Sequence, residues 1–267
     1  MRSESKESSV AGEASNLDTT VIIPSRNEVR LLGSVLTGIW AMRPRNSRLE
    51  FLVLDDASTD DTPTVLDSLS KEIPLTFIRH PRSLGFGGAL AHGIQQAQTP
   101  WLLFVDADAQ YDPEDVRRFL NLPRDPLTLF SGWRVRRADP FVRIFISILF
   151  QTMNRIGFDL RMKDITSSLK LIPSGPAKEI ARRVHYMNGS FWSEFMVRWA
   201  RAGYHWIEIP IHHQPRFDSH SRVFAPGSLG RLVVHQGVGF LRLLRELSLA
   251  SEKTTSVPTA VSQNTVR

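Results

Sequence analysis

Residues 101–110 read WLLFVDADAQ, an apolar run that ends in two aspartates separated by one residue. Residues 51–56, FLVLDD, form a similar apolar run that ends in two adjacent aspartates. A short apolar run that stops at polar residues is typical of a buried strand, so we predict strands at residues 51–54 and 101–105. Both strands would then carry carboxylates at their carboxyl ends.

The first half of the chain alternates strand patterns with helix patterns. Strands are also predicted at residues 20–23, 75–78 and 127–130, and helices at 28–40, at 60–71, from the glycine loop to about 98, and from Pro113 onward. This alternation predicts an α/β fold with a mainly parallel sheet and helices on both faces. Ligands of such sheets bind beyond the carboxyl ends of the strands. We therefore expect the strand-end carboxylates to converge on one crevice: Asp55, Asp56, Asp106 and Asp108.

The second half differs in pattern. Helices are predicted at 141–158, 177–183 and 191–202, and a strand at 206–211. Residues 1–18 and 251–267 are rich in small polar residues and are predicted to be disordered tails. The expected organisation is a domain at 19–225 followed by an amphipathic helical segment at 226–250. No apolar run reaches the length of a membrane-spanning helix, and residues 1–18 lack the apolar core of a secretory signal.

Charge is divided unevenly along the chain. Residues 19–130 hold 11 Lys/Arg against 14 Asp/Glu, whereas residues 131–250 hold 18 against 8. An acidic half and a basic half indicate two tasks, or only an Arg-rich solvated surface. The absence of cysteine excludes disulfides and thiolate metal sites, and it fits a reducing compartment. The sequence pI of about 10.0 permits nucleic acid, but no recognisable binding module supports that partner.

Each motif has a chemical and a structural interpretation. Carboxylates spaced as Asp106 and Asp108 suit Mg²⁺ or Mn²⁺, although an aspartate here could also cap the helix that starts at Pro113. The pair at 55–56 could bind a ribose and a base, or form a turn. The glycine loop SLGFGG (83–88) allows close approach of a ligand, or merely a tight turn.

The four motifs together narrow these choices. PSRNE (24–28), LDDAST (54–59), LGFGGAL (84–90) and DADAQ (106–110) follow the order and spacing of family 2 glycosyltransferases of the Rossmann-like GT-A fold. The resemblance covers about residues 19–225. DADAQYDPED also resembles the polyprenol-phosphate glycosyltransferases, a group that includes the dolichol-phosphate mannose synthases.

The resemblance implies roles for individual residues. It implies a metal site at Asp106, Asp108 and Gln110. Donor binding is implied for Pro24, Arg26, Asn27, Glu28, Asp55, Asp56, Gly85, Gly87 and Asp106. Acceptor phosphate binding is implied for Arg134, Arg143, Ser147, Arg216, Ser221 and Arg222, and direct catalytic roles for Asp108, Arg134 and Arg216.

The implied activity is inverting transfer of a hexose from GDP-mannose or UDP-glucose to a polyprenyl phosphate, dolichyl or undecaprenyl. A phosphate acceptor is already an anion near neutral pH and needs no general base. The expected location is the cytoplasmic face of a membrane, bound peripherally, with a possible membrane-protein partner. Helices 141–158 and 229–247 could lie on the bilayer with their arginines toward the headgroups, or simply pack on the core as amphipathic helices. Two alternatives stay open: a hydroxyl acceptor, with Asp164 or Glu194 as the base, and a non-catalytic binding protein.

Overall fold

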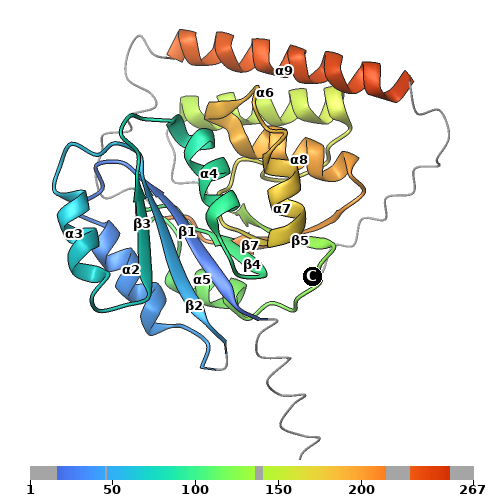
Figure 1. The fold of residues 1–267 in the computed structure, drawn as a ribbon. Coiled ribbons are helices and arrows are strands. Elements are labelled where there is room, and N and C mark those ends of the chain that lie inside the picture. Colours follow the sequence, from blue (N-terminus) through green and yellow to red (C-terminus); the bar gives the residue numbers. More distant parts are fainter. Residues whose placement is uncertain (1–16, 46, 136–140, 215–228, 253–267) are drawn as a thin grey trace, which may run out of the picture.

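The computed structural model of the chain contains one mixed sheet of seven strands, in the order β3-β2-β1-β4-β6-β5-β7 (Figure 1). The structure describes residues 17–45, 47–135, 141–214 and 229–252. Neighbouring strands are parallel except where β6 runs against β4 and β5. The strands are β1 (Thr19–Ser25), β2 (Leu49–Asp55), β3 (Leu75–Arg79), β4 (Trp101–Phe104), β5 (Thr128–Arg134), β6 (Lys170–Pro173) and β7 (His205–Ile211).

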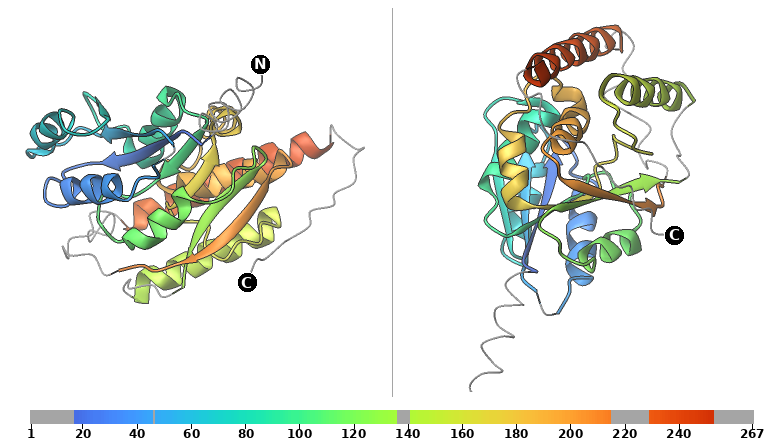
Figure 2. Two further views of the ribbon diagram at one scale, coloured as in Figure 1. Left: turned by 90° about the horizontal axis from the view of Figure 1, so that it is seen from below. Right: turned by 90° about the vertical axis from the view of Figure 1, so that its right-hand side faces the viewer.

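Helices cover both faces of the sheet, as predicted (Figure 2). Helices α2, α3 and α5 pack on one face, α4, α7 and α8 on the other, and α6 and α9 join this second layer. Their bounds are α2 (Leu32–Ala41), α3 (Thr62–Leu69), α4 (Gly85–Gln96), α5 (Pro113–Leu120), α6 (Phe141–Phe158), α7 (Ser174–Ala181), η1 (Asn188–Ser190, a 3-10 turn), α8 (Phe191–Arg201) and α9 (Leu229–Glu252).

Strand β1 shows why its sequence gives a central strand. Val21 and Ile23 are buried in the core on one face, and Ile22 is buried in the core on the other. Successive strand residues face opposite sides, so a strand covered on both faces must be apolar at every position. Each such side chain contributes about 1.5–3 kcal/mol when fully buried.

The sequence did not predict strand β6, which joins the two halves of the sheet. Its four residues, KLIP, pair antiparallel with β4 and β5. The strand begins with Lys170, which is fully buried. Lysine is almost never fully buried unless it is paired, so a strand that begins with lysine does not match the pattern of a buried strand.

The structure describes only a few residues of the two predicted tails, 1–18 and 251–267. The predicted tails fall almost wholly outside the described residues, but Asp18 is held firmly, since its Oδ1 accepts a hydrogen bond of 2.9 Å from the backbone N–H of Arg48. Among the described residues, none of the helices combines the length and the apolar character that crossing a membrane requires.

Helix α8 carries a buried ion pair that anchors the neighbouring 185–190 turn. Glu194 is fully buried, accepts hydrogen bonds from the backbone N–H groups of His185, Tyr186 and Met187, and pairs with Arg198 at 2.8 Å. Arg198 also reaches Glu246 of α9 at 2.8 Å. One carboxylate therefore links α8 to the turn and, through Arg198, to α9.

Replacing this carboxylate should be costly. Glu194→Gln removes the buried one of the two charges that balance Arg198 and weakens three backbone hydrogen bonds, so we expect a loss of about 3–5 kcal/mol in unfolding free energy. The control is Glu179→Gln, which breaks an exposed pair with Arg183 at the same i,i+4 spacing and should cost below about 0.5 kcal/mol. Urea denaturation measures both, and equal losses would contradict the anchoring role.

Candidate functional site

The carboxyl ends of three adjacent strands form the candidate site. Because β1 pairs in parallel with both β2 and β4, the acidic residues after β2 and β4 meet at one edge of the sheet. A non-glycine residue with positive φ follows each strand: Asn27 (54°), Ala57 (60°) and Ala109 (56°). This conformation costs about 1–2 kcal/mol per residue, and such strain is concentrated at functional sites.

Asp55 presents a buried carboxylate at the end of β2. Its Oδ1 accepts a hydrogen bond of 3.0 Å from the backbone N–H of Ser58, while its Oδ2 is buried without a hydrogen-bond partner. The Nε of Arg79, at the end of β3, lies 3.5 Å from that Oδ2. A buried acceptor beside a half-exposed guanidinium suits a polar ligand such as a nucleotide base. Sequence analysis overlooked Arg79, although the strand-end rule applies to it equally.

Asp56 is bound to the glycine loop. Its carboxylate accepts hydrogen bonds from the hydroxyl of Ser83 (2.6 Å), the backbone N–H groups of Leu84 (2.7 Å) and Gly85 (3.0 Å), and Nδ1 of His80 (3.0 Å). Burial alone would raise the pKa of Asp56, but these hydrogen bonds outweigh it and lower the pKa. Nε2 of His80 in turn lies 2.9 Å from Nδ1 of His92. Asp56 thus positions the loop, and direct contact with a donor stays a prediction.

The glycines of the loop leave space that another part of the chain, Asn188, occupies. Gly85 has a φ of +75°, and a Cβ at Gly87 would lie 2.7 Å from the carbonyl oxygen of Asn188. The side chain of Asn188 donates to the carbonyl of Leu84 and accepts from the N–H of Gly88, both at 2.9 Å. The close approach that glycine permits here is therefore that of the 185–190 turn.

The DADAQ segment lies open at the end of β4. Asp106 and Asp108 are half-buried, while Ala107 between them is buried. The hydroxyl of Tyr111 donates to Asp106 at 3.1 Å, and Asp108 accepts from the backbone N–H of Gln110 at 3.3 Å. Asp112, and not Asp108, caps α5 by accepting from the N–H of Glu114 at 2.8 Å. Capping therefore does not explain the first two aspartates.

The donor set of this segment fits a hard divalent cation. Mg²⁺ commonly takes one or two protein carboxylates and completes its shell with water and substrate phosphate. The described residues contain no group of three or more acidic or histidine side chains placed to hold a metal by themselves. Gln110 is buried, and its side-chain N–H donates to the carbonyl of Gln214 at 3.0 Å. Its predicted metal contact stays a prediction.

Arg134 is paired inside the protein. Its Nε and Nη2 donate to the two carboxylate oxygens of Asp164 at 2.6 and 2.9 Å, and both side chains are buried. Glu208 of β7 holds this arrangement, since its carboxylate accepts from the backbone N–H groups of Lys163 (2.8 Å) and Asp164 (3.0 Å). The structure thus gives Arg134 an internal carboxylate, and its predicted phosphate contact is untested.

Other predicted residues are placed less fully. Pro24 lies within β1, and Arg26 is exposed just after it. In the loop that follows, the side chain of Asn27 accepts a hydrogen bond from the backbone N–H of Thr59 at 2.6 Å. The backbone N–H of Glu28 donates to the hydroxyl of Thr62 at 3.2 Å. Ser147 is half-buried on α6. The side chain of Arg143, and the whole of Arg216, Ser221 and Arg222, lie outside what the structure describes.

Lys170 is fully buried behind the site. The sequence patterns predicted neither this residue as part of the site nor the strand β6 that it begins. Its Nζ donates to the hydroxyl of Ser131 (2.7 Å) and the carbonyl of Ser167 (2.6 Å). Burial lowers the pKa of Lys170 to about 7, although the charges of Asp164 and Glu208 partly oppose that shift. A cation that titrates near neutral pH therefore lies among the acidic groups of the site.

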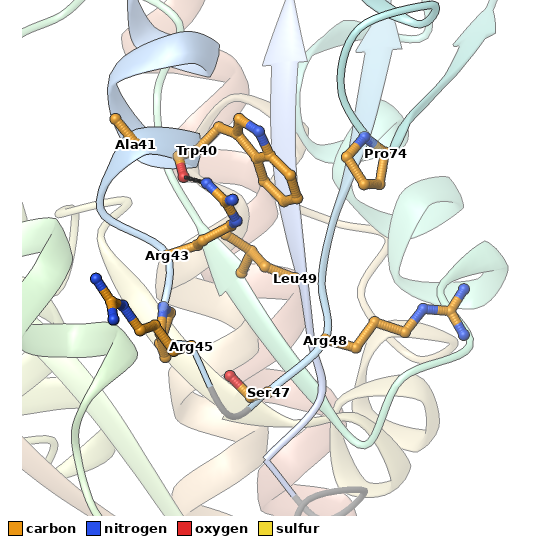
Figure 3. A pocket seen from close by; sticks show the side chains of 9 residues that line it. Trp40, Ala41, Arg43, Arg45, Ser47, Arg48, Leu49 and Pro74 are labelled. Carbon is orange, nitrogen blue, oxygen red and sulfur yellow. Dashed lines mark hydrogen bonds between the residues drawn. The ribbon is translucent and has the colours of Figure 1, made fainter.

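A separate pocket lies at the opposite, amino end of β2 and β3. Figure 3 shows Arg43 turned over the ring of Trp40, while Arg45 and Arg48 point away from each other. The guanidinium of Arg43 lies 3.9 Å from the Trp40 ring centroid, and Arg48 pairs with Glu50 at 2.8 Å. The arginines do not converge, so this pocket does not form an anion site.

The sequence model of a protein family described as glycosyl transferase family 2 matches residues 20–180 of the chain. The chain belongs to glycosyltransferase family 2. Its strand-end carboxylates and glycine loop are therefore those of a family member, and the resemblance predicted from the motifs is confirmed.

Two relatives illustrate the similarity. Glycosyltransferase AglD of Haloferax volcanii is 28% identical over 222 residues, which is 78% of this chain but only 35% of that protein. The undecaprenyl-phosphate mannosyltransferase of Micrococcus luteus is 28% identical over 223 residues, covering 80% of this chain and 90% of that protein. The chain is therefore similar in extent to the second relative and to about a third of the first.

Solved structures confirm the GT-A fold. The mannosyltransferase PcManGT of Pyrobaculum calidifontis, in complex with GDP-Man and Mn²⁺, aligns with a TM-score of 0.55 at 19% identity, over 90% of this chain and 76% of that one. Glucosyl-3-phosphoglycerate synthase of Mycobacterium tuberculosis, in complex with Mn²⁺, UDP and phosphoglyceric acid, aligns with a TM-score of 0.63 at 16% identity, over 91% and 84%.

The buried lysine predicts a specific pH dependence of stability. In the unfolded chain the pKa of Lys170 is near 10.5, whereas in the folded protein burial lowers it to about 7. Lys170 therefore destabilises the fold most below pH 7, and this penalty shrinks as the pH rises toward 10. In urea denaturation, the free energy of unfolding of Lys170→Met should exceed that of the wild type most at pH 6.5. The difference should become progressively smaller at pH 8 and 9.5. The control Lys71→Met, at an exposed residue, should show a constant difference, and a constant difference for Lys170→Met would refute the shift.

Proposed function

We propose that this chain transfers a hexose from a nucleoside-diphosphate sugar, GDP-mannose or UDP-glucose, to a polyprenyl phosphate with inversion at the sugar. Mg²⁺ or Mn²⁺ would be the cofactor, and the reaction would take place at the cytoplasmic face of a membrane, with a membrane-protein partner possible. The observation that carries the proposal is the set of carboxylates at the ends of β2 and β4 in a family 2 fold.

The donor half of the site supports a nucleotide. Asp55 has one buried oxygen without a hydrogen-bond partner, 3.5 Å from Nε of Arg79, at a strand end where nucleotides bind in parallel sheets. Asp106 and Asp108 would hold the divalent cation, which when bound neutralises the charge that develops on the leaving diphosphate. The residues of the chain provide orientation, since both aspartates and the glycine loop are fixed by hydrogen bonds.

The acceptor half supports a phosphate, because the two carboxylates considered as bases for a hydroxyl acceptor are both engaged in ion pairs. The two candidates, Asp164 and Glu194, are each buried in an ion pair with an arginine. A carboxylate that is buried and bidentate with arginine must break that pair before it can take a proton. A phosphomonoester has a second pKa of about 6 and attacks as an anion, so it needs no such group. The relatives named for undecaprenyl phosphate and dolichyl phosphate agree with this acceptor class.

Helices α6 and α9 offer a surface for the lipid. Figure 1 shows them at the end of the molecule toward which β1 runs. Their outward sides expose Ile148 and Ile156 on α6 and Val234, Leu241 and Leu249 on α9, while Phe240 and Leu243 face the core. Arg242 and Arg245 are exposed beside the apolar residues of α9. An apolar stripe flanked by arginines suits an anionic membrane surface.

A transfer assay tests the activity. The chain is incubated with Mn²⁺, membranes containing undecaprenyl or dolichyl phosphate, and either GDP-mannose or UDP-glucose carrying labelled sugar. We expect label in the lipid phase with one donor, and a loss of about 10²-fold or more in Asp108→Asn, because the electrostatic stabilisation of the leaving group disappears. Asp112→Asn is the control, since asparagine caps a helix as well as aspartate. Donor hydrolysis or glycan labelling without lipid product would favour a hydroxyl acceptor, and no donor binding would favour a non-catalytic protein.

Vesicle sedimentation tests the membrane surface. The wild type should sediment with vesicles of phosphatidylglycerol and phosphatidylcholine, and Leu241→Glu should bind roughly tenfold more weakly, because one large apolar side chain contributes about 1.5–3 kcal/mol. Leu127→Glu is the control: this leucine is also more than half exposed but lies just before the amino end of β5. Equal loss in both variants would contradict a membrane role for α9.

A further inference from the structure

The 185–190 turn lies between the glycine loop and helix α9, two parts of the protein that the proposed function assigns to donor and lipid. On one side Asn188 donates to the carbonyl of Leu84 and accepts from the N–H of Gly88, each at 2.9 Å. These two hydrogen bonds join residues about one hundred positions apart in the chain. They connect the beginning of α4 to the second half of the protein.

The glycine loop fits this turn closely. A Cβ at Gly85 would lie 2.8 Å from Nδ2 of Asn188, and one at Gly87 would lie 2.7 Å from its carbonyl oxygen. These contacts, one with the side chain and one with the backbone of Asn188, leave no room between the loop and the turn. Any displacement of the turn must therefore be followed by the loop, whose other side is bound to Asp56.

Helix α9 contacts the same turn from the other side. A Cβ at Gly239 of α9 would lie 2.5 Å from the carbonyl oxygen of Tyr186 and 3.1 Å from the side chain of Met187. The backbone N–H groups of Tyr186 and Met187 are bound by Glu194, whose partner Arg198 pairs with Glu246 of α9. The turn is thus held by close packing and by a chain of charges.

We propose that Asn188 is a positioning residue for the donor site, and that through it the placement of α9 sets the placement of the glycine loop. This inference rests on the proposed function, in which the loop adjoins the nucleotide. It makes α9 more than a lipid contact: the helix holds the turn that holds the loop. Donor affinity should therefore respond to changes on α9 that lie far from the strand-end carboxylates.

The first test compares two amide side chains that make hydrogen bonds at opposite ends of α4: Asn188 at its beginning and Gln95 near its end. Asn188→Ala removes two hydrogen bonds at the loop, and Gln95→Ala removes two at the other end of the helix, to Lys178 and Arg182. Titration calorimetry with GDP and with UDP, each with Mn²⁺, should show about five- to tenfold weaker binding for Asn188→Ala and no change for Gln95→Ala. In the transfer assay the KM for the donor should rise with little change in kcat. Asn188→Asp, which keeps the acceptor for Gly88, should fall between Asn188→Ala and the wild type.

The second test acts on α9 and keeps Asn188 intact. Gly239→Ala places a methyl group against the carbonyl of Tyr186, whereas Gly237→Ala, also on α9, adds one where no atom lies within 4 Å. Gly239→Ala should weaken nucleotide binding several-fold, and Gly237→Ala should leave it unchanged, although both replace a glycine of the same helix. Equal nucleotide affinities in these two variants would overturn the link to α9.

The outcomes separate this inference from the proposed function. If the wild type binds neither nucleotide, the proposed function fails and the inference fails with it. If the wild type binds and Asn188→Ala binds equally well, or weakens no more than Gln95→Ala, the positioning role alone is overturned.

Discussion

The parallel pairing of β1 with both β2 and β4 is the constraint on which the site depends. In this register Ser25 lies opposite Asp55, and Ile22 opposite Phe104, so that DADAQ begins just beyond the last paired residues of β4. Three strands that are adjacent in the sheet therefore end at the same edge, and a residue of positive φ follows each of them. The chain leaves the sheet sharply at all three points, and the acidic side chains remain at the edge.

The second half of the chain completes this edge by supplying counter-charges and support. Glu208 of β7 binds the backbone at 163–164, Asp164 binds Arg134, and Lys170 lies buried behind them. Such a network balances charge only while all its members stay paired, because an uncompensated buried charge is costly. The basic character of the second half is thus partly structural, which is a reason why its arginines cannot all be assigned to phosphate.

Sequence patterns predicted the features that depend on local order. Strand-end carboxylates, the helix at Pro113 and the layered α/β fold follow from short apolar runs and turn residues. The patterns could not predict β6, because a buried lysine contradicts the preference on which the prediction rests. Nor could they predict that Asp56 binds the glycine loop or that Gly87 accommodates Asn188, since those partners lie about 30 and 100 residues away in the chain.

The glycine loop shows how one motif can serve folding and function together. Its backbone is bound on one side by the carboxylate of Asp56 and on the other by the amide of Asn188. A loop bound on both sides loses little further freedom when a ligand arrives, and preorganisation of this kind strengthens binding without new contacts. The glycines are then required because two parts of the protein meet there, and the same fit that excludes a Cβ keeps the loop in one place for a ligand at the strand ends.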